Sequence, residues 1–317
     1  MRSGTGDFEG LRIAIVGCGK MGREHARAVT ALGARVVTVC DPIAESARAL
    51  AAAHDGCTGV ADPGGLDWRA LDAIFICTPP VARGPLELAA IEAGVPFFVE
   101  KPIGLSAEHV APILRALDRR PVIHSVGYMN RYRSSVRRAR DHAADGAVAM
   151  SAAWIGKVYR LDWWLRADHS GGPLNEQGTH LVDLGRHLLG EVVEVAALST
   201  QAPTDPATGS VAASLRFASG ACGTLLYSCC ASDKLIGVEL YTRSRVVRLR
   251  DWELRLEGEP APEEDVFVAQ AAAFLTAVRA GSPRTIRSTF QDALRTQLVV
   301  DALGRAIATG RPQELVP

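Results

Sequence analysis

A glycine-rich turn between a predicted strand and a predicted helix limits the fold of this chain more than any other feature. An apolar run over residues 11–16 precedes the turn, and a helical stretch over residues 23–32 follows it. The turn itself consists of Gly17, Cys18, Gly19, Lys20, Met21 and Gly22. In a GxGxxG motif the first glycine permits a tight turn, the second lets the backbone approach a pyrophosphate, and the third allows close helix packing. The helix N-terminus then faces the phosphates, so the pattern predicts a dinucleotide site.

An acidic residue in the expected place supports this interpretation. A second predicted strand, residues 34–40, ends in Asp41, nineteen residues after Gly22. A carboxylate there accepts hydrogen bonds from the adenosine ribose, whereas a 2′-phosphate meets a like charge. Pro42 supplies no compensating cation, so we expect NAD(H) to be preferred. NADP(H) stays possible because Arg48 lies one or two turns along the next predicted helix.

Strands and helices alternate through the first third of the chain. Further strands are predicted over residues 73–77, 95–99 and 122–126, with helices over 44–53, 84–93 and 107–118. This order predicts a doubly wound, parallel-sheet Rossmann domain in an α/β protein. Right-handed crossovers place the strand ends on one edge, so Gly17, Asp41, Thr78, Pro79, Glu100 and Lys101 are expected to converge at the cofactor.

Lys101 follows directly after the apolar residues 95–99, at the end of a predicted strand. The carboxyl ends of strands line the ligand crevice in an open parallel sheet, which favours a lysine in the site. The alternative is a surface lysine paired with Glu100, and the spacing alone does not decide between the two.

The remainder of the chain has a different pattern. Strands without intervening helices are predicted over residues 147–159, 192–200, 210–217, 221–230, 235–242, 246–250 and 252–256. They predict an α+β domain with a large, open-faced, mainly antiparallel sheet. We expect a dinucleotide-binding domain over 1–124 and a substrate-binding and oligomerisation domain over 125–317, with the last helix a candidate to pack back on the first domain. Alternating positions such as Leu225, Tyr227 and Cys229, or Leu235, Gly237 and Glu239, are expected on the uncovered sheet face.

Composition excludes several classes of partner. The 317 residues include 35 Lys plus Arg and 35 Asp plus Glu, so no overall field attracts nucleic acid or an anionic membrane. The apolar runs are strand-sized and the first ten residues are polar, which predicts no membrane association and a cytoplasmic location. The seven cysteines contain no CxxC pair, so we expect no metal site and no disulfide framework.

One predicted helix interrupts the second half, over residues 174–189, and opens with Ser170-Gly-Gly-Pro. Its polar residues Glu176, His180, Asp183 and His187 recur at helical spacing and share one face. Such a stripe is a solvated face, a metal site built from carboxylates and imidazoles, or a substrate-binding acid/base face. The sequence leaves the three alternatives open.

Four segments together resemble the Gfo/Idh/MocA oxidoreductases, the family of glucose-fructose oxidoreductase and inositol dehydrogenase. They are GCGKMGREHARA at the glycine turn, EKPIG at 100–104, VGYMNRY at 126–132 and GGPLNEQGTHLVDL at 171–184. The resemblance implies a Rossmann domain joined to an open-faced sheet domain, a nicotinamide cofactor, and dimers or tetramers formed through the sheet face. It also implies that Lys101 acts at the nicotinamide, and it carries His180 and Glu176 over as catalytic candidates.

The departures from the family pattern concern the substrate. Glu176 stands where many members have aspartate, Arg83 where a histidine is common after the TP pair, and Asn130 where an arginine is common. Ser170 replaces a frequent third glycine and suits a helix entry. These changes predict a substrate different from that of the better-known members.

These observations predict an oxidoreductase that transfers hydride between nicotinamide C4 and a secondary alcohol or ketone of a sugar, cyclitol or similar polar ring. Lys101 is the predicted acid/base, and the predicted substrate-binding residues are Lys101, Tyr128, Asn130, Trp163, Glu176 and His180. Trp164 is a further candidate for an apolar wall. The alternatives are a reductase of C=C or C=N bonds, a dihydrodiol dehydrogenase, and a nucleotide-sensing regulator without catalysis.

Overall fold

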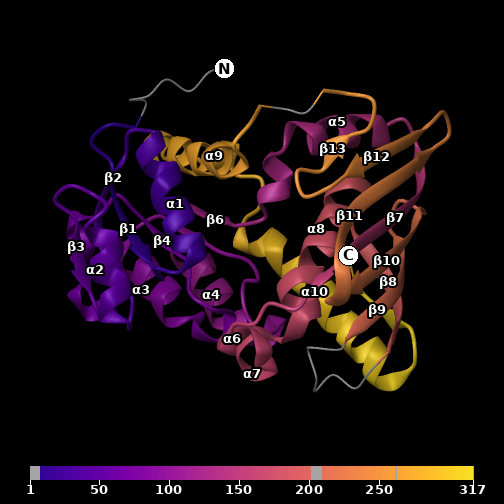
Figure 1. Cartoon of the computed structure of the whole chain (residues 1–317), viewed down its shortest axis with the longest axis horizontal. Coiled ribbons are helices and arrows are strands. Elements are labelled where there is room, and N and C mark those ends of the chain that lie inside the picture. Colours follow the sequence, from indigo (N-terminus) through magenta and orange to yellow (C-terminus); the bar gives the residue numbers. More distant parts are fainter. Residues whose placement is uncertain (1–7, 201–208, 261–262, 317) are drawn as a thin grey trace. The chain divides into compact units, whose positions relative to one another are not determined.

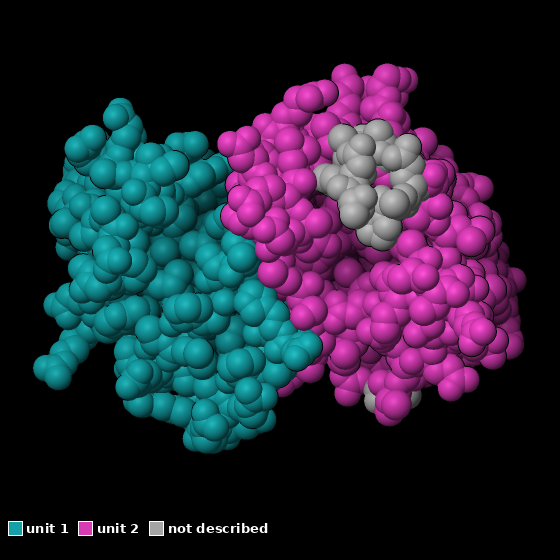
Figure 2. All heavy atoms as spheres, turned by 90° about the horizontal axis from the view of Figure 1, so that it is seen from below, with its two compact units in different colours: residues 1–103, 108–129, 265–290 teal, residues 104–107, 130–264, 291–317 magenta. Residues whose placement is uncertain are grey.

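A computed structural model of the chain describes residues 8–200, 209–260 and 263–316. The expectations for the polar N-terminus therefore fall mainly outside the described residues. The chain divides into two compact units (Figure 2). Unit 1 comprises residues 1–103, 108–129 and 265–290, and unit 2 comprises 104–107, 130–264 and 291–317. Each unit contains its own sheet.

The sheet of unit 1 has six strands in the order β3-β2-β1-β4-β5-β6, and every neighbouring pair is parallel (Figure 1). The strands are β1 (Arg12–Val16), β2 (Arg35–Cys40), β3 (Thr58–Val60), β4 (Ala73–Ile76), β5 (Phe97–Val99) and β6 (His124–Val126). The reversal of strand order beside β1 is that of a doubly wound sheet. The predicted Rossmann architecture is confirmed, and β3 is a strand that the sequence patterns missed.

Helices cover this sheet because its strands are apolar on both faces. Alternate residues Ile13 and Ile15 of β1 lie in one core cluster with residues of α1 (Lys20–Ala31), α2 (Ala44–Ala51) and α9 (Val266–Ala280). Phe75 of β4 packs edge-on against Phe274 of α9, with ring centroids 5.3 Å apart. A helix from the far end of the chain thus completes the core of the N-terminal unit.

The remaining helices of this part of the chain connect the strands. They are α3 (Pro85–Ala93) and α4 (Ala107–Arg119), with short 3₁₀ turns at Pro63–Gly65, Trp68–Ala70, Pro80–Ala82, Met129–Tyr132 and Pro283–Thr285. Gly94, in the left-handed region at φ 73°, ends α3. Residues 125–129, which the sequence-based boundary assigns to the second domain, belong to unit 1.

Unit 2 is built on an eight-stranded sheet in the order β13-β12-β11-β7-β10-β9-β8-β14. Its strands are β7 (Ala147–Lys157), β8 (Val192–Ser199), β9 (Ser210–Phe217), β10 (Cys222–Ser228), β11 (Cys230–Thr242), β12 (Val246–Arg250), β13 (Arg255–Leu256) and β14 (Gln313–Glu314). Only β7 and β10 pair in parallel among these strands. The expected mainly antiparallel sheet is confirmed, but residues 252–254 form a turn with Leu254 at φ 50° instead of a strand.

One face of this sheet packs on α5 (Ser134–Ala143), α8 (Thr179–Leu189) and α10 (Phe290–Thr309). Two short helices, α6 (Asp162–Leu165) and α7 (Ala167–Ser170), precede α8. The last helix α10 lies almost entirely in unit 2, in which its Val299 and Leu303 join the core. No helix in the described part of the chain combines the length and apolar character needed to cross a membrane.

The other face of the sheet is uncovered. Gly237 and Glu239 of β11 lie on it as expected, in register with Leu226 and Thr224, whereas the residues expected from β10 do not. Leu225, Tyr227 and Cys229 are buried in the core, so their assignment to the open face was wrong by one residue in register. The neighbours Thr224 and Leu226 are exposed instead. Because side chains alternate between faces, a shift of one residue exchanges the whole set.

Candidate active site

The glycine turn of unit 1 has the shape that a pyrophosphate requires. Gly17 lies at φ 91°, and a Cβ there would come within 2.7 Å of the Cys77 carbonyl oxygen. A Cβ on Gly22 would lie 1.8 Å from the Gly17 oxygen, so neither position admits a larger residue. A Cβ on Gly19, by contrast, would meet nothing within 4 Å. The turn is therefore closed toward the protein and open on the side from which a phosphate approaches.

The first turn of α1 offers its backbone N–H groups to an anion. Gly19 occupies the N-cap position, no side chain caps the helix, and no acidic residue lies in its first turn. Lys20 and Met21 form that turn, and Lys20 is exposed. Uncapped N–H groups and the helix dipole favour negative charge here. The local structure fits the diphosphate of a dinucleotide.

Asp41 lies at the end of β2, next to the same turn. Its Oδ2 accepts a hydrogen bond of 2.8 Å from the Cys18 backbone N–H, and its Oδ1 accepts one of 2.9 Å from that of Ile43. These bonds fix the carboxylate while each oxygen keeps a further lone pair for a ribose hydroxyl. Burial, with Asp41 as the next contributor, raises the pKa of Cys18 to about 12, so the thiol in the turn stays protonated.

The residues after β4 form hydrogen bonds that link the carboxyl ends of β4 and β5. Pro79 and Pro80 end the strand, and Thr78 accepts a 3.0 Å hydrogen bond at Oγ1 from Nη1 of Arg83. Arg83 is only 2% exposed, and its other bonds go to backbone carbonyl groups. The structure therefore places Arg83 in the interior of unit 1, bonded to protein atoms, although its sequence position predicted a change of substrate.

Lys101 follows β5 with Glu100 directly before it. Glu100 is 6% exposed, and its Oε1 lies 2.7 Å from Nε2 of His25. Its Oε2 accepts a hydrogen bond of 3.1 Å from the Lys101 backbone N–H. The Lys101–Pro102 peptide bond is cis. Both Glu100 oxygens thus have partners among the protein groups, and the carboxylate is buried instead of lying on the surface.

His25 is a residue that the sequence analysis did not single out. It lies on the buried side of α1 with Gly22, Ala26 and Val29, at helical spacing from them. A histidine on an otherwise small and apolar helix face was the available signal, because a buried imidazole needs a polar partner. The spacing alone does not reveal that the partner is Glu100.

The polar stripe of unit 2 divides into residues with different partners. Residues Leu174–Gly178 form a π-helical turn, and α8 continues from Thr179. Trp164 donates from Nε1 to Oε2 of Glu176 at 2.9 Å, and His180 stacks on Trp154 at 5.2 Å with an interplanar angle of 8°. Glu176 and His180 are therefore the members of the stripe that aromatic side chains position.

Asp183 has a different role from the other two. Arg131 holds it with a 2.6 Å contact between Nη2 and Oδ1, and the two side chains are 5% and 1% exposed. Nη1 of Arg131 also reaches Asp292 at 2.7 Å. Asp183 is thus part of a buried ion-pair network that fixes α8, so the one-face prediction mixed a structural residue with candidate site residues.

The other predicted substrate residues differ in exposure. Tyr128 is 1% exposed in unit 1, and Asn130 is 4% exposed in unit 2, where its Oδ1 accepts a 2.9 Å bond from Nε of Arg133. Trp163 is partly exposed and packs against the unit 2 core, whereas Trp164 is buried. Among the residues described, no group of three His, Cys, Asp or Glu side chains is arranged to hold a metal ion.

Family models match both halves of the chain. The model of the oxidoreductase family with an NAD-binding Rossmann fold matches residues 11–128, and the GFO/IDH/MocA C-terminal domain model matches residues 134–247. Inositol 2-dehydrogenase 1 of Saccharopolyspora erythraea is 31% identical over 319 residues, which cover 95% of this chain and 88% of that protein. The chain belongs to the Gfo/Idh/MocA oxidoreductase family.

Other members match over part of their length or in structure. Inositol 2-dehydrogenase 2 of the same organism is 30% identical over 198 residues, which are 60% of this chain and 57% of that protein. The chain spans little more than half of several such curated Gfo/Idh/MocA relatives. The structure of GenD2 from gentamicin A biosynthesis, in complex with NAD, has a TM-score of 0.86 and 25% identity, covering 98% of this chain and 97% of that one.

Proposed function

We propose that this chain is an NAD(H)-dependent oxidoreductase that acts on a secondary alcohol or ketone of a sugar, cyclitol or similar polar ring, with Lys101 as the acid/base. The observation that carries the proposal is that three predicted site elements lie at the same edge of the unit 1 sheet. There, the Gly17–Gly22 turn, Asp41 and Lys101 follow β1, β2 and β5, and each is held by bonds within the unit. Family relatives named as inositol and levoglucosan dehydrogenases support the substrate class.

The chain's own residues divide the work of the reaction. A bound nicotinamide supplies the hydride acceptor or donor at C4. Lys101 takes the hydroxyl proton when an alcohol is oxidised and returns it when a ketone is reduced. His180 and Glu176 bind substrate hydroxyl groups, since an imidazole and a carboxylate pair well with a polyol. The uncapped α1 N-terminus and Asp41 hold the diphosphate and the ribose.

NAD(H) is the cofactor that the residues around Asp41 favour. The carboxylate repels a 2′-phosphate, and the next side chains are Pro42 and the 64%-exposed Ile43, neither of which carries a compensating charge. The NAD complex of GenD2 supports this choice.

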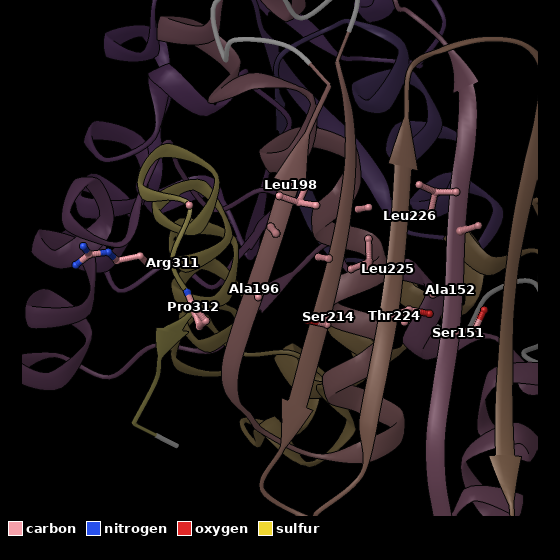
Figure 3. A pocket seen from close by; sticks show the side chains of 15 residues that line it. Ser151, Ala152, Ala196, Leu198, Ser214, Thr224, Leu225, Leu226, Arg311 and Pro312 are labelled. Carbon is pink, nitrogen blue, oxygen red and sulfur yellow. The ribbon is translucent and has the colours of Figure 1, made fainter.

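We also propose that a second copy of the chain covers the open sheet face of unit 2, giving a homodimer or homotetramer. The face contains a concavity of about 560 Å³ lined by small side chains of β7, β8, β9 and β10, with the segment Gly310–Pro312 at its border (Figure 3). Leu198 and Leu226 stand on this face and are 74% and 46% exposed. Apolar side chains on an uncovered sheet are typical of protein interfaces.

A substrate screen tests the proposed reaction. Purified protein is incubated with sugars, cyclitols, uronic acids and their keto forms, and nicotinamide absorbance is followed with NAD, NADH, NADP and NADPH. Turnover of a polyol with NAD is the expected result. Turnover only of compounds with an activated C=C or C=N bond identifies the reductase alternative. Tight NADH binding without turnover of any compound identifies a sensor.

A further inference from the structure

His25 is a polar residue in an otherwise aromatic environment. Its ring is fully buried, and the rings of Phe98, Phe75 and Phe267 lie 4.7, 5.3 and 5.9 Å from it. Nδ1 is buried with no hydrogen-bond partner among the described residues. A leucine or phenylalanine would fill such a site without leaving a polar atom unpaired. The bond from Nε2 to Glu100 is thus the polar contact that explains a histidine here.

Glu100 is fixed through its side chain and its backbone. Its carboxylate bonds to His25 at 2.7 Å and to the Lys101 backbone N–H at 3.1 Å. Its backbone N–H donates to the Ile76 carbonyl at 2.9 Å, and its own carbonyl accepts a 2.7 Å bond from Nη2 of Arg83. The carboxylate, the backbone N–H and the backbone carbonyl of Glu100, the residue directly before Lys101, are therefore all hydrogen-bonded.

Arg83 brings a buried cation to the same place. Its guanidinium bonds to the carbonyls of Ile76, Glu100 and Pro102 and to the Thr78 hydroxyl. Burial lowers the pKa of Arg83, and the nearby carboxylates of Glu87 and Glu100 oppose that shift. Burying a charged group is costly unless its donors are hydrogen-bonded. The planar guanidinium of Arg83 meets this requirement because it bonds to several acceptors at once. Ile76 and Thr78 lie at the end of β4. Glu100 and Pro102 follow β5 and are the residues before and after Lys101.

We propose that His25 and Arg83 are positioning residues for Lys101, and that both act through Glu100. Neither touches the reacting atoms. They fix the backbone from which the flexible lysine side chain extends, and a displacement of about 1 Å at a reacting group can cost about 10²-fold in rate. The inference rests on the proposed role of Lys101 as acid/base.

Replacement of His25 by leucine and by glutamine tests the proposal. His25→Leu removes the donor to Glu100, and we expect kcat to fall by about 10²-fold while the Kd for NADH, measured by fluorescence, changes less than about threefold. His25→Gln keeps an N–H donor near the Nε2 position, and we expect it to recover kcat to within about tenfold of the parent. Val29→Ala, on the same buried helix face but without a bond to Glu100, is the matched control for destabilisation.

A double-variant cycle separates positioning from general damage. If His25 acts through Lys101, His25→Leu should lower kcat by less than about twofold when it is added to Lys101→Met. An equal loss in both backgrounds, or a His25→Leu enzyme within about threefold of the parent, overturns the inference. Full activity of Lys101→Met overturns the proposed function instead, which distinguishes the two failures.

Arg83→Lys provides a second test should His25→Leu not fold. Lysine keeps the charge but not the planar set of donors. We expect kcat to fall by at least about tenfold, with the melting temperature of the variant above the assay temperature and NADH binding retained. A folded Arg83→Lys enzyme with the kcat of the parent removes Arg83 from the proposal. A folded Glu100→Gln enzyme with the kcat of the parent overturns the proposal as a whole, because both His25 and Arg83 are proposed to act through Glu100.

Discussion

The indole N–H of Trp164 donates a hydrogen bond of 2.9 Å to Oε2 of Glu176, on the π-helical turn that begins at Leu174. Trp164 is 1% exposed, so its position is fixed by packing. A rigid donor of this kind sets the orientation of the longer glutamate side chain at a position where family members often have aspartate. The pair thereby connects a core residue to a candidate substrate ligand.

Trp164→Phe should therefore impair substrate binding more than cofactor binding. A hydrogen bond to a charged group contributes about 1.5–3 kcal/mol, so kcat/KM for the substrate should fall by about 10 to 10²-fold. Steady-state kinetics and NADH titration measure the two effects. Trp68→Phe in unit 1 is the control, and equal losses for both variants would argue against a role for the Trp164–Glu176 bond.

Lys101→Met should abolish most of the chemical step. Methionine keeps most of the side-chain packing but removes the ammonium group, and general-base catalysis contributes about 10² to 10⁴-fold. We expect kcat to fall by that factor, with little change in the melting curve or in NADH affinity. His180→Ala should lose less if His180 only orients the substrate. Turnover by Lys101→Met within a few-fold of the parent would make Glu176 and His180 the leading acid/base candidates.

Asp41→Ser should weaken the preference for NAD. The change removes the charge that opposes a 2′-phosphate and the acceptor for the Cys18 N–H. The ratio of kcat/KM with NAD to that with NADP should fall at least about tenfold, and Asp41→Ser/Ile43→Arg should reverse it by adding a cation. Comparable kcat/KM values for both cofactors in the parent enzyme would contradict the assigned role of Asp41.

A charge on the open face should dissociate the proposed oligomer. Leu226→Glu and Leu198→Glu place a carboxylate on the exposed side of β10 or β8, where a partner sheet would have to bury it. Light scattering at micromolar concentration should show an oligomer for the parent and a smaller species for the variants. Leu298→Glu, on α10, serves as the control. A parent that is monomeric at this concentration removes the interface proposal.

Arg131→Met should lower stability because it leaves Asp183 as a buried charge without its cation. Breaking a buried ion pair costs about 3–5 kcal/mol in the free energy of unfolding, whereas replacing both partners is often far less costly. Urea denaturation of Arg131→Met, and of Arg131→Met/Asp183→Leu, should show a large loss and then partial recovery. Additive losses would mean that the Arg131–Asp183 contact has little energetic weight.

The sequence was sufficient for most of the fold because five of the six strands of unit 1 carry their own signal. Gly17, Gly22 and Asp41 mark the end of β1, the start of α1 and the end of β2, and all three lie where expected. The short strand Thr58–Val60 was missed because three residues show no periodicity. On β10, the open face was assigned with the wrong parity because Leu225 and Leu226 are equally apolar, and only tertiary packing decides which one is buried.

Motif and spacing nominate Glu176, His180 and Lys101 as site residues, and their roles stay predictions. The partners of the candidate residues were not predictable where the contacts join residues distant in sequence. The bond between His25 and Glu100 joins residues 75 positions apart. The bond between Trp164 and Glu176 joins α6 to the π-helical turn, with α7 and two glycines between them in the chain. Helical spacing grouped Asp183 with His180. It does not show that Arg131 forms an ion pair with Asp183, or that Trp154 stacks on His180.

Helix α9 has a consequence for how the chain is made. It supplies Phe274 and Leu275 to the core of unit 1, although every strand of that unit lies within residues 12–126. A ribosome releases the whole of the unit 1 sheet, and then residues 130–264 of unit 2, before it releases the helix that closes the first core. Until α9 is released, Phe75 and Phe98 of the nascent sheet lack their contacts with Phe274. The N-terminal unit therefore completes its folding late in synthesis, although it is made first.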